Sequence, residues 1–440
     1  MSSATFIKLR INNAEQFRES VSEPTPNTNL YLAFGKVTGW ANDADPDVAN
    51  TSVATEYEIW SNMIGAKKLA SSDMAHIIPR YDWTANTKYI AYDHMNTNLY
   101  DGNTKFYVLT DDYNVYKCIA NANGSNSTVQ PTAVNPEALT YTSDGYVWKY
   151  MYTVSDSDQL RFTTNQYIPV RTITTDDGSL QWQVQDAVIA GEINNIVLAN
   201  GGSNYTNTSN MVVSISGDGT GATADVSVNT TTNVVSSITL TDYGRNYTFA
   251  TVSISGGGGS GATARAIISP LGGHGSNPLY ELGGAAIMVN GVLRNTEEDT
   301  FPATNDYRQV SLVKDPLRPD GANVSSNLRA FQAYSLTTIG TGDYAQDESV
   351  YQGASLAVSS FSGRIVSWDS ANGVAVIINT VGTPTSQSLI GANTSTSRFV
   401  SSINPPDLTP YSGQILYVDN VKPITRASDQ TEDFKIVIKF

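Results

Sequence analysis

Histidine and cysteine, which supply many catalytic groups and metal ligands, are rare in this 440-residue chain. Its three histidines are His76, His94 and His274, and none has a second histidine or a cysteine at the spacing that zinc sites use. We therefore predict that the chain binds no metal. We expect a structural role for His76 and a hydrogen bond within its loop for His274.

Nucleophiles in a catalytic setting are equally sparse. Cys118 is the single cysteine, so no disulfide within the chain is possible, which fits assembly in a reducing cytoplasm. Because Cys118 stands in an alternating stretch, residues 114–120, we expect it to be a small buried hydrophobic side chain. The sequence contains no Gly-x-Ser-x-Gly motif.

Two groups of acidic residues could supply the pair of carboxyl groups that glycoside cleavage requires. They are Asp111 with Asp112, and Asp429 with Glu432 and Asp433. Both groups flank predicted turns or strand starts, where acidic residues are common. We predict that the chain is not an enzyme, has no catalytic residues and carries no cofactor.

Glycines are concentrated at residues 256–262, which match a phosphate-binding loop only in composition. No Gly-Lys-Ser/Thr follows and no helix is predicted there, so tight β-turns account better for these glycines. Asp218 and Asp225 could touch a calcium ion. They lack the regular nonapeptide repeat of calcium-binding β-structures, so turns again account better for them.

Charge and hydropathy exclude several kinds of partner. The formal net charge is −15 and the longest basic run is Lys67 with Lys68, so we predict no nucleic-acid partner. No apolar run approaches the length of a membrane span and the N-terminus lacks a signal-peptide core, so we predict a soluble chain with no membrane partner. The acidity either serves solubility or complements a basic partner.

Small polar residues and glycine are abundant while charged residues make up only 15% of the chain, a bias that favours β-structure. Further alternating stretches between 105 and 154 predict three strands. The N-terminal patterns predict a strand at 5–10, a helix at 14–23 capped by Asn12 or Asn13, a strand at 30–34, and a helix at about 56–69.

The last of the three strands carries Tyr146, Trp148, Tyr150 and Tyr152 on one face at period two. Such a row could be a surface on which carbohydrates stack. An aromatic strand face more often belongs to the core or to a subunit interface. We therefore treat these four residues as candidate interface or core-fixing residues.

Two stretches predict small β modules. Residues 193–269 repeat the order strand, Gly-Tyr turn, strand, Gly-rich turn, strand, with Tyr205 and Tyr247 lying 42 residues apart (247 − 205). Two copies are too few for a solenoid and indicate one β-domain with internal pseudo-symmetry. Residues 334–408 contain short predicted strands and a hairpin at 369–373, which indicate a small barrel or sandwich.

Four separated segments share a pattern with one known family. They are residues 29–41, 58–84, 143–153 and 413–440. In this order they resemble the small dimeric wedge subunits of the baseplates of T4-type contractile-tailed bacteriophages. The resemblance implies a mainly β (α+β) fold, with a layered β-sandwich core and a few helices, into which two small all-β modules are inserted.

At 440 residues the chain is longer than a single hydrophobic core usually supports, so we expect several domains. The two modules have no counterpart in the T4 form of the family and divide the core. The expected parts are the N-terminal part of the core at 1–185, the Gly-rich repeat module at 190–270, the continued core at 271–333, the small barrel or sandwich at 334–408, and the C-terminal core strands at 409–440.

The resemblance also implies a function without turnover. It implies a structural virion protein of the tail baseplate, assembled in the host cytoplasm, that forms a homodimer and joins other baseplate wedge proteins. Such a subunit takes part in the baseplate rearrangement that triggers tail contraction. Its binding energy would come from aromatic and aliphatic surface buried at the interfaces.

Within the segment 58–84, Arg80 and Asp82 stand beside Trp83. A charged pair in this setting either fixes the fold internally or contacts another subunit, and all three residues are candidate interface or core-fixing residues. A host-glycan or receptor-binding tail protein is the alternative function. Four of the six tryptophans lie in the part of the chain that resembles the family, which favours packing over glycan stacking.

Overall fold

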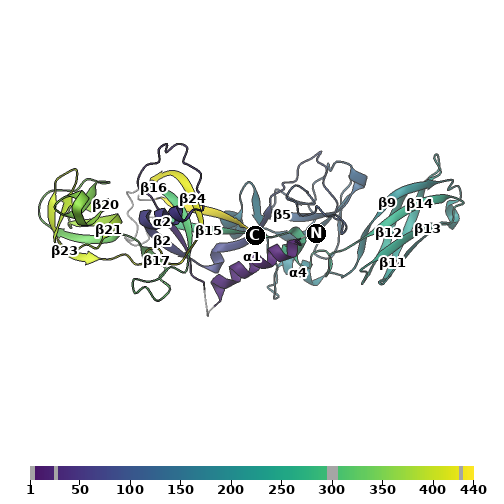
Figure 1. The fold of residues 1–440 in the computed structure, drawn as a ribbon. Coiled ribbons are helices and arrows are strands. Elements are labelled where there is room, and N and C mark those ends of the chain that lie inside the picture. Colours follow the sequence, from purple (N-terminus) through teal and green to yellow (C-terminus); the bar gives the residue numbers. More distant parts are fainter. Residues whose placement is uncertain (1–4, 24–27, 295–305, 426–429) are drawn as a thin grey trace, which may run out of the picture. The chain divides into compact units, whose positions relative to one another are not determined.

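The computed structural model describes residues 5–23, 28–294, 306–425 and 430–440. They form five α-helices, four short 3-10 helices and 25 strands, so the prediction of a mainly β chain with a few helices is confirmed (Figure 1). None of the described helices is both long and apolar enough to cross a membrane. The chain forms two compact units: unit 1 comprises Met1–Glu15, Ala75–Met288 and Val437–Phe440, and unit 2 comprises Gln16–Met74 and Val289–Ile436.

Four of the five α-helices begin after a side-chain cap. Ser52, Ser155, Ser179 and Asn277 each accept a hydrogen bond from a backbone N–H in the first turn of α2, α3, α4 and α5, respectively. The α-helices α1 to α5 span Ile7–Ser22, Val53–Asn62, Asp156–Phe162, Leu180–Asp186 and Pro278–Leu282. The 3-10 helices η1 to η4 span Ser71–Asp73, Ala122–Gly124, Thr208–Asn210 and Leu356–Val358.

Helix α1 begins earlier than the sequence indicated. The strand predicted at 5–10 is wrong, because the helix begins at Ile7, and the predicted caps Asn12 and Asn13 lie inside it. Ile11, four residues after Ile7, is fully buried in a core cluster against which Ile7 also packs. This spacing places both side chains on one face of a helix, whereas the alternation of residues 5–10 suggested a strand.

The helix predicted at about 56–69 is wrong in its second half. Helix α2 ends at Asn62, and Met63–Leu69 form strand β2, which pairs with β1 at Leu30–Gly35. Gly65 costs a helix about 1 kcal/mol relative to alanine. Pairing with a buried neighbouring strand therefore decides the conformation of this segment against its local pattern.

Unit 2 is built on a five-stranded antiparallel sheet with the order β17-β2-β1-β16-β24. Its strands span Arg329–Phe331, Met63–Leu69, Leu30–Gly35, Asp306–Lys314 and Gln414–Thr425. The central strand β1 confirms the strand predicted at 30–34 and is buried along its whole length. Helix α2 covers one face of the sheet, where Ile59 and Trp60 pack in one cluster with Tyr31 and Val313.

Unit 2 also contains a closed barrel with the strand order β18-β21-β20-β19-β22-β23. Phe361, Ile365 and Ile377 are fully buried in its interior. The hairpin predicted at 369–373 joins β20 to β21. The strands β18 to β23 span Tyr334–Ile339, Ser349–Gly353, Ser359–Asp369, Val374–Gly382, Ser388–Gly391 and Ser397–Asn404.

Two further sheets have four strands each. In unit 1, the order β4-β5-β7-β6 contains the three strands predicted between 105 and 154, at Tyr107–Leu109, Asn114–Asn121 and Tyr146–Thr153, with β6 at Thr140–Tyr141. The second sheet has the order β25-β15-β3-β8, with strands at Thr431–Lys439, Ala286–Arg294, Met74–Pro79 and Tyr167–Pro169.

The internal repeat folds as two small sheets in unit 1, with the orders β10-β13-β14-β9 and β11-β12. The first strand of each repeat pairs with the third strand of the other, β9 with β14 and β12 with β11, and the two middle strands pair with each other. The two copies therefore complete one another across a pseudo-twofold axis. The strands β9 to β14 span Ile193–Ser203, Val212–Gly217, Thr220–Asn229, Val234–Arg245, Ala250–Ser255 and Ser260–Ile268.

Equivalent tyrosines and glycines close each half of this repeat module. The backbone N–H of Ala262 donates to the hydroxyl of Tyr205 at 3.3 Å, and that of Ala222 donates to the hydroxyl of Tyr247 at 3.4 Å. A Cβ added at Gly219 would lie 2.4 Å from Cγ of Tyr247. One added at Gly259 would lie 2.5 Å from Cγ of Tyr205. The rings thus occupy the space that a side chain at either glycine would need.

Because the two sites are equivalent, we expect Gly219→Ala and Gly259→Ala to destabilise the protein by similar amounts, about 1–3 kcal/mol each. Gly39→Ala is the control, since its added Cβ would meet no atom closer than 3.6 Å. Urea denaturation of each variant measures the effect. Stability equal to that of the wild-type protein at either site would refute this account of the repeat.

Candidate functional site

The aromatic row of β7 lies in the core of unit 1. Tyr146, Trp148 and Tyr150 are fully buried. The rings of Tyr146 and Trp148 stack with 5.4 Å between their centroids, and Tyr89 meets Trp148 edge-on at 5.6 Å. These three side chains therefore offer no exposed platform on which a carbohydrate could stack.

Tyr152 departs from the predicted single face. The ladder between β5 and β7 is irregular between Val115 and Tyr116, which face Tyr152 and Tyr150, respectively. Tyr152 consequently packs in a different hydrophobic cluster, and its hydroxyl donates to the carbonyl of Pro169 at 2.8 Å. A sequence pattern of period two does not reveal such a break in register.

Arg80, Asp82 and Trp83 make contacts within unit 1. Nε of Arg80 lies 2.8 Å from Oδ1 of Asp82, and a second guanidinium nitrogen donates to the carbonyl of Thr164 at 3.1 Å. The indole of Trp83 donates to Oγ of Ser127 at 3.2 Å. All three side chains thus form hydrogen bonds within unit 1. A subunit contact through Arg80 and Asp82 stays a prediction.

Unit 1 contains a buried ion pair that was not predicted from the sequence. Nζ of Lys117, on β5, lies 2.8 Å from Oε2 of Glu281, on α5, and the two side chains are 0% and 3% exposed. The ammonium group of Lys117 also lies 4.2 Å from the ring centroid of Tyr92. Burial lowers the pKa of Lys117, while the negative charge and hydrogen bond of Glu281 oppose that shift.

Glu281 also holds the loop before its own helix. Its carboxylate accepts hydrogen bonds from the backbone N–H of Gly275, at 2.9 Å and 3.1 Å to the two oxygens, and from that of Asn277 at 3.1 Å. One carboxylate thereby ties strand β5 to the loop and to helix α5. The loop needs glycine at 275, where φ is +101°.

Lys149 is the second buried lysine of this sheet, directly opposite Lys117 in the ladder of β5 and β7. Its Nζ donates to the carbonyl of Pro136 at 2.7 Å. Burial lowers the pKa of Lys149 as well. The sequence did contain a signal for these two buried lysines, since each of them interrupts a run of apolar and aromatic strand residues.

His274 lies beside this charged centre, with its ring edge-on to Tyr92 at 4.9 Å between centroids. Its Nδ1 has no hydrogen-bond partner among the described residues, so the predicted loop hydrogen bond is absent at that atom. Burial, followed by the positive charges of Lys117 and Lys149, lowers the pKa of His274 well below its ordinary value. The imidazole is therefore neutral at pH 7.

Other residues singled out by the sequence have structural contacts. His76 is buried and its Nδ1 lies 3.1 Å from the carbonyl oxygen of Gly284. Cys118 is fully buried, as predicted. Asp218 accepts hydrogen bonds from the backbone N–H of Thr248 and Phe249 in the turn that precedes β13.

The sequence pointed to two acidic groups, Asp111 with Asp112, and Asp429 with Glu432 and Asp433. Asp433 contacts Asn290 and Lys435, and Asp429 lies outside the described residues. Among the described residues, no group of three or more His, Cys, Asp or Glu side chains could hold a metal ion.

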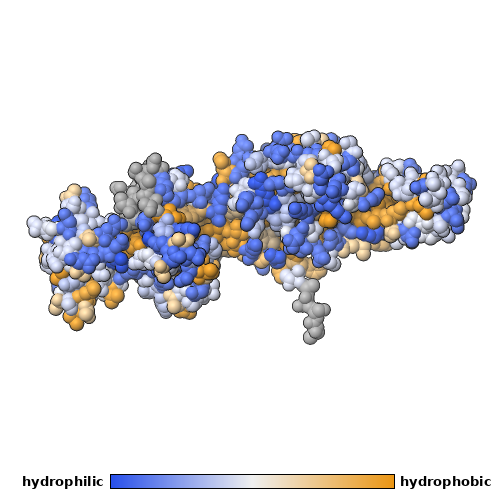
Figure 2. Space-filling view, turned by 90° about the horizontal axis from the view of Figure 1, so that it is seen from above, coloured by the Kyte–Doolittle hydropathy of each residue, from blue (hydrophilic) through white to orange (hydrophobic). Residues whose placement is uncertain are grey.

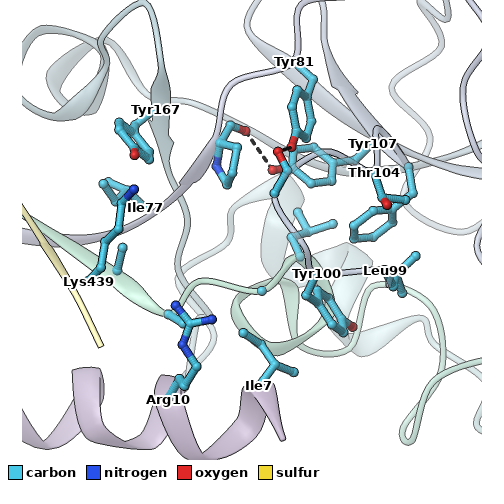
Figure 3. Close-up of a pocket in the computed structure, with 17 residues that line it drawn as sticks. Ile7, Arg10, Ile77, Tyr81, Leu99, Tyr100, Thr104, Tyr107, Tyr167 and Lys439 are labelled. Atoms are coloured by element: carbon cyan, nitrogen blue, oxygen red, sulfur yellow. Dashed lines mark hydrogen bonds between the residues drawn. The ribbon is translucent and has the colours of Figure 1, made fainter. Parts of the chain in front are cut away.

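Unit 1 contains a pocket of about 160 Å³ bordered by Tyr81 and Tyr107, with Arg10 and Lys439 across from them (Figure 3). The hydroxyl of Tyr81 donates to the carbonyl of Gly102 at 2.6 Å, and that of Tyr107 donates to a backbone carbonyl at 2.7 Å. Arg10 donates to the backbone carbonyl of the last residue. Most of the polar groups that line this pocket thus already have hydrogen-bond partners within the chain. The volume of the pocket is enough only for a ligand of about the size of benzene.

The first third of the chain matches a known protein family. Residues 3–134 match the model of the family described as Bacteriophage T4, Gp8. The resemblance to the T4-type wedge family is thereby confirmed. A similar protein is the baseplate wedge protein gp8 of Enterobacteria phage T4, which is 23% identical over 197 residues. That alignment covers 37% of this chain and 59% of the relative, so the chain spans less than two-thirds of the relative's length.

The match to the Gp8 family model has a defined place in the fold. It includes α1, the central strand β1 with its neighbour β2, helix α2 and strand β5. The segments 29–41 and 58–84 lie inside the matched residues, whereas 143–153 and 413–440 lie outside. Both β modules also lie outside the match.

We expect removal of one partner of the buried ion pair to destabilise the protein strongly. Lys117→Met leaves the carboxylate of Glu281 buried without its cation, at a cost of about 3–5 kcal/mol. The double variant Lys117→Met, Glu281→Gln removes both charges and should recover part of that loss. Urea denaturation of both variants measures the difference, and a double variant less stable than Lys117→Met would contradict this expectation.

The neutral state of His274 gives a pH dependence with a defined sign. Its pKa is lower in the folded than in the unfolded protein, so the unfolded chain binds the proton more readily and the free energy of unfolding decreases as pH falls below about 6.5. We expect wild-type protein to lose stability more steeply than His274→Gln between about pH 7 and pH 5. Urea denaturation at several pH values tests this, with His94→Gln as the comparison at a partly exposed histidine, whose pKa burial also lowers, but less than that of the buried His274. Parallel curves for wild-type protein and His274→Gln would refute it.

Proposed function

We propose that this chain is a structural subunit of a phage tail baseplate, located in the virion and acting through protein–protein contacts without turnover. The single observation that carries this proposal is the match of residues 3–134 to the Gp8 family, whose T4 member is named a baseplate wedge protein. The matched residues supply the central strand of unit 2 and the helix that covers its sheet. In this proposal the subunit joins neighbouring wedge proteins and takes part in the rearrangement that triggers tail contraction.

We assign the contact between two copies of this chain to a patch on unit 2. Val53 and Tyr57 lie four residues apart on the outward face of α2 and are 63% and 57% exposed. Tyr411, also 57% exposed, meets Tyr57 edge-on at 5.3 Å between ring centroids. Tyrosine is enriched at protein interfaces because its ring is apolar and its hydroxyl tolerates water.

The surroundings of this patch support the same assignment. Tyr411 also lines a pocket of about 380 Å³ together with Trp60 and four prolines. On the face of the molecule shown in Figure 2, hydrophobic residues form patches between hydrophilic ones. Helix α2 itself belongs to the residues that match the Gp8 family.

We expect the purified chain to be a dimer, with about twice the chain mass of 47.3 kDa, in light scattering at micromolar concentration. The double variant Tyr57→Ser, Tyr411→Ser should be a folded monomer, because both side chains are more than half exposed and support little of the core. Val358→Ser, at another exposed apolar residue of unit 2, is the control and should stay dimeric. A monomeric wild-type chain would refute the dimer, and a dimeric double variant would refute only the assignment of the patch.

Co-expression with the other wedge proteins of the same phage tests the wider proposal. A stable complex that elutes as one species in size-exclusion chromatography is the expected result. If this chain elutes apart from every wedge protein of its own phage, the proposed wedge role is wrong.

A further inference from the structure

Unit 1 contains a groove of about 720 Å³ between the repeat module and the sheet that holds β5, β6 and β7. Strands β9 and β12 line one side. The other side is formed by the end of β5, the 3-10 helix η2, and Tyr141 on β6. The volume lies within the range of about 300–1,000 Å³ that is usual for ligand sites.

None of the described residues that line this groove is charged, although the chain as a whole carries a net charge of −15. The polar lining consists of amides and hydroxyls, which together can both donate and accept hydrogen bonds. They belong to Asn121, Asn123, Asn194, Asn195, Ser236, Ser237, Thr239, Tyr141 and Tyr243. Such a lining suits a neutral ligand that carries many hydroxyl groups.

Asn194 supplies an acceptor that the fold leaves unused. Only 8% of the residue is exposed, and its Nδ2 donates to the carboxylate of Glu192 at 3.2 Å. Its Oδ1 is buried and has no hydrogen-bond partner among the described residues. A buried carbonyl oxygen without a donor costs about 1–3 kcal/mol. Because Asn194 lines the groove, rotation of its carboxamide would bring this oxygen to an O–H of a bound ligand.

Two of the residues that line the groove are Tyr141 and Tyr243. The hydroxyls of Tyr141 and Tyr243 are hydrogen-bonded to each other between the core sheet and the module. Tyr141 is 65% exposed, so its ring is accessible to a ligand. Nearby, Nδ2 of Asn195 donates to the carbonyl of Ile119 at 3.3 Å, which ties β9 to β5. The two walls of the groove are thus held together by contacts of their own.

We propose that this groove binds a neutral saccharide. Sugar hydroxyls match the amide and hydroxyl lining, the buried Oδ1 of Asn194 accepts one of them, and the apolar C–H face of a sugar ring packs on the exposed ring of Tyr141. An anionic or cationic ligand would find no compensating charge in the lining. The binding residues lie on the module and on the sheet beside it, not on the buried aromatic row of β7.

The test uses the full chain on an array of neutral and acidic oligosaccharides, followed by calorimetric titration of the strongest binder. We expect binding to neutral glycans, and a loss of affinity of about tenfold in Tyr141→Ala, which removes one stacking ring from an exposed position. Asn194→Asp puts a negative charge at the buried acceptor and should weaken binding further. Phe249→Ala, at an exposed aromatic of the same module outside the groove, is the control and should bind as the wild-type protein does.

Thermal unfolding of each variant separates loss of binding from loss of fold, and Tyr141→Ala is expected to unfold with the wild-type protein. Binding only to acidic glycans, binding to none, or equal affinity in Tyr141→Ala would overturn the proposal. Binding of an uncharged peptide in the groove, with no binding of any saccharide, would also overturn it. None of these outcomes bears on the wedge role, which rests on other residues.

Discussion

The fold of unit 1 depends on two buried lysines, each of which needs an acceptor for its ammonium group. Lys117 and Lys149 face each other across adjacent strands, and like charges in that position repel. Each ammonium group instead contacts an acceptor of its own. Lys117 contacts the carboxylate of Glu281, and Lys149 donates to the carbonyl of Pro136. With water excluded, each ammonium group needs its own acceptor. The loop and helix that supply these acceptors are therefore fixed against the aromatic strand.

Local patterns in the sequence predicted much of this structure. The alternation of residues 146–154 predicted strand β7, and the spacing of Tyr205 and Tyr247 predicted the repeat whose strands the structure shows in the same order. In both cases the signal lies within a short stretch, because a strand face repeats every two residues and a turn requires particular residue types.

Predictions failed where a distant part of the chain decides the outcome. Residues 63–69 form a strand because β1 is available to pair with them, and α1 begins at Ile7 because Ile11 meets a core formed by residues far away in sequence. The pairing of Lys117 with Glu281 joins residues 164 positions apart, and no local pattern encodes it. Nor did the sequence show that Tyr152 packs apart from the other aromatics of its strand.

The proposed function rests on a family match in the first third of the chain, and the two β modules lie outside that match. In the proposed subunit, the matched elements carry the wedge contacts and the repeat module adds a groove with different chemistry. The most direct test of the wedge role is cryo-electron microscopy of the intact tail of the phage that encodes this chain. We expect density for two contacting copies of the chain within each wedge of the baseplate. Density for the chain only in tail fibres, or its absence from the tail, would contradict the account.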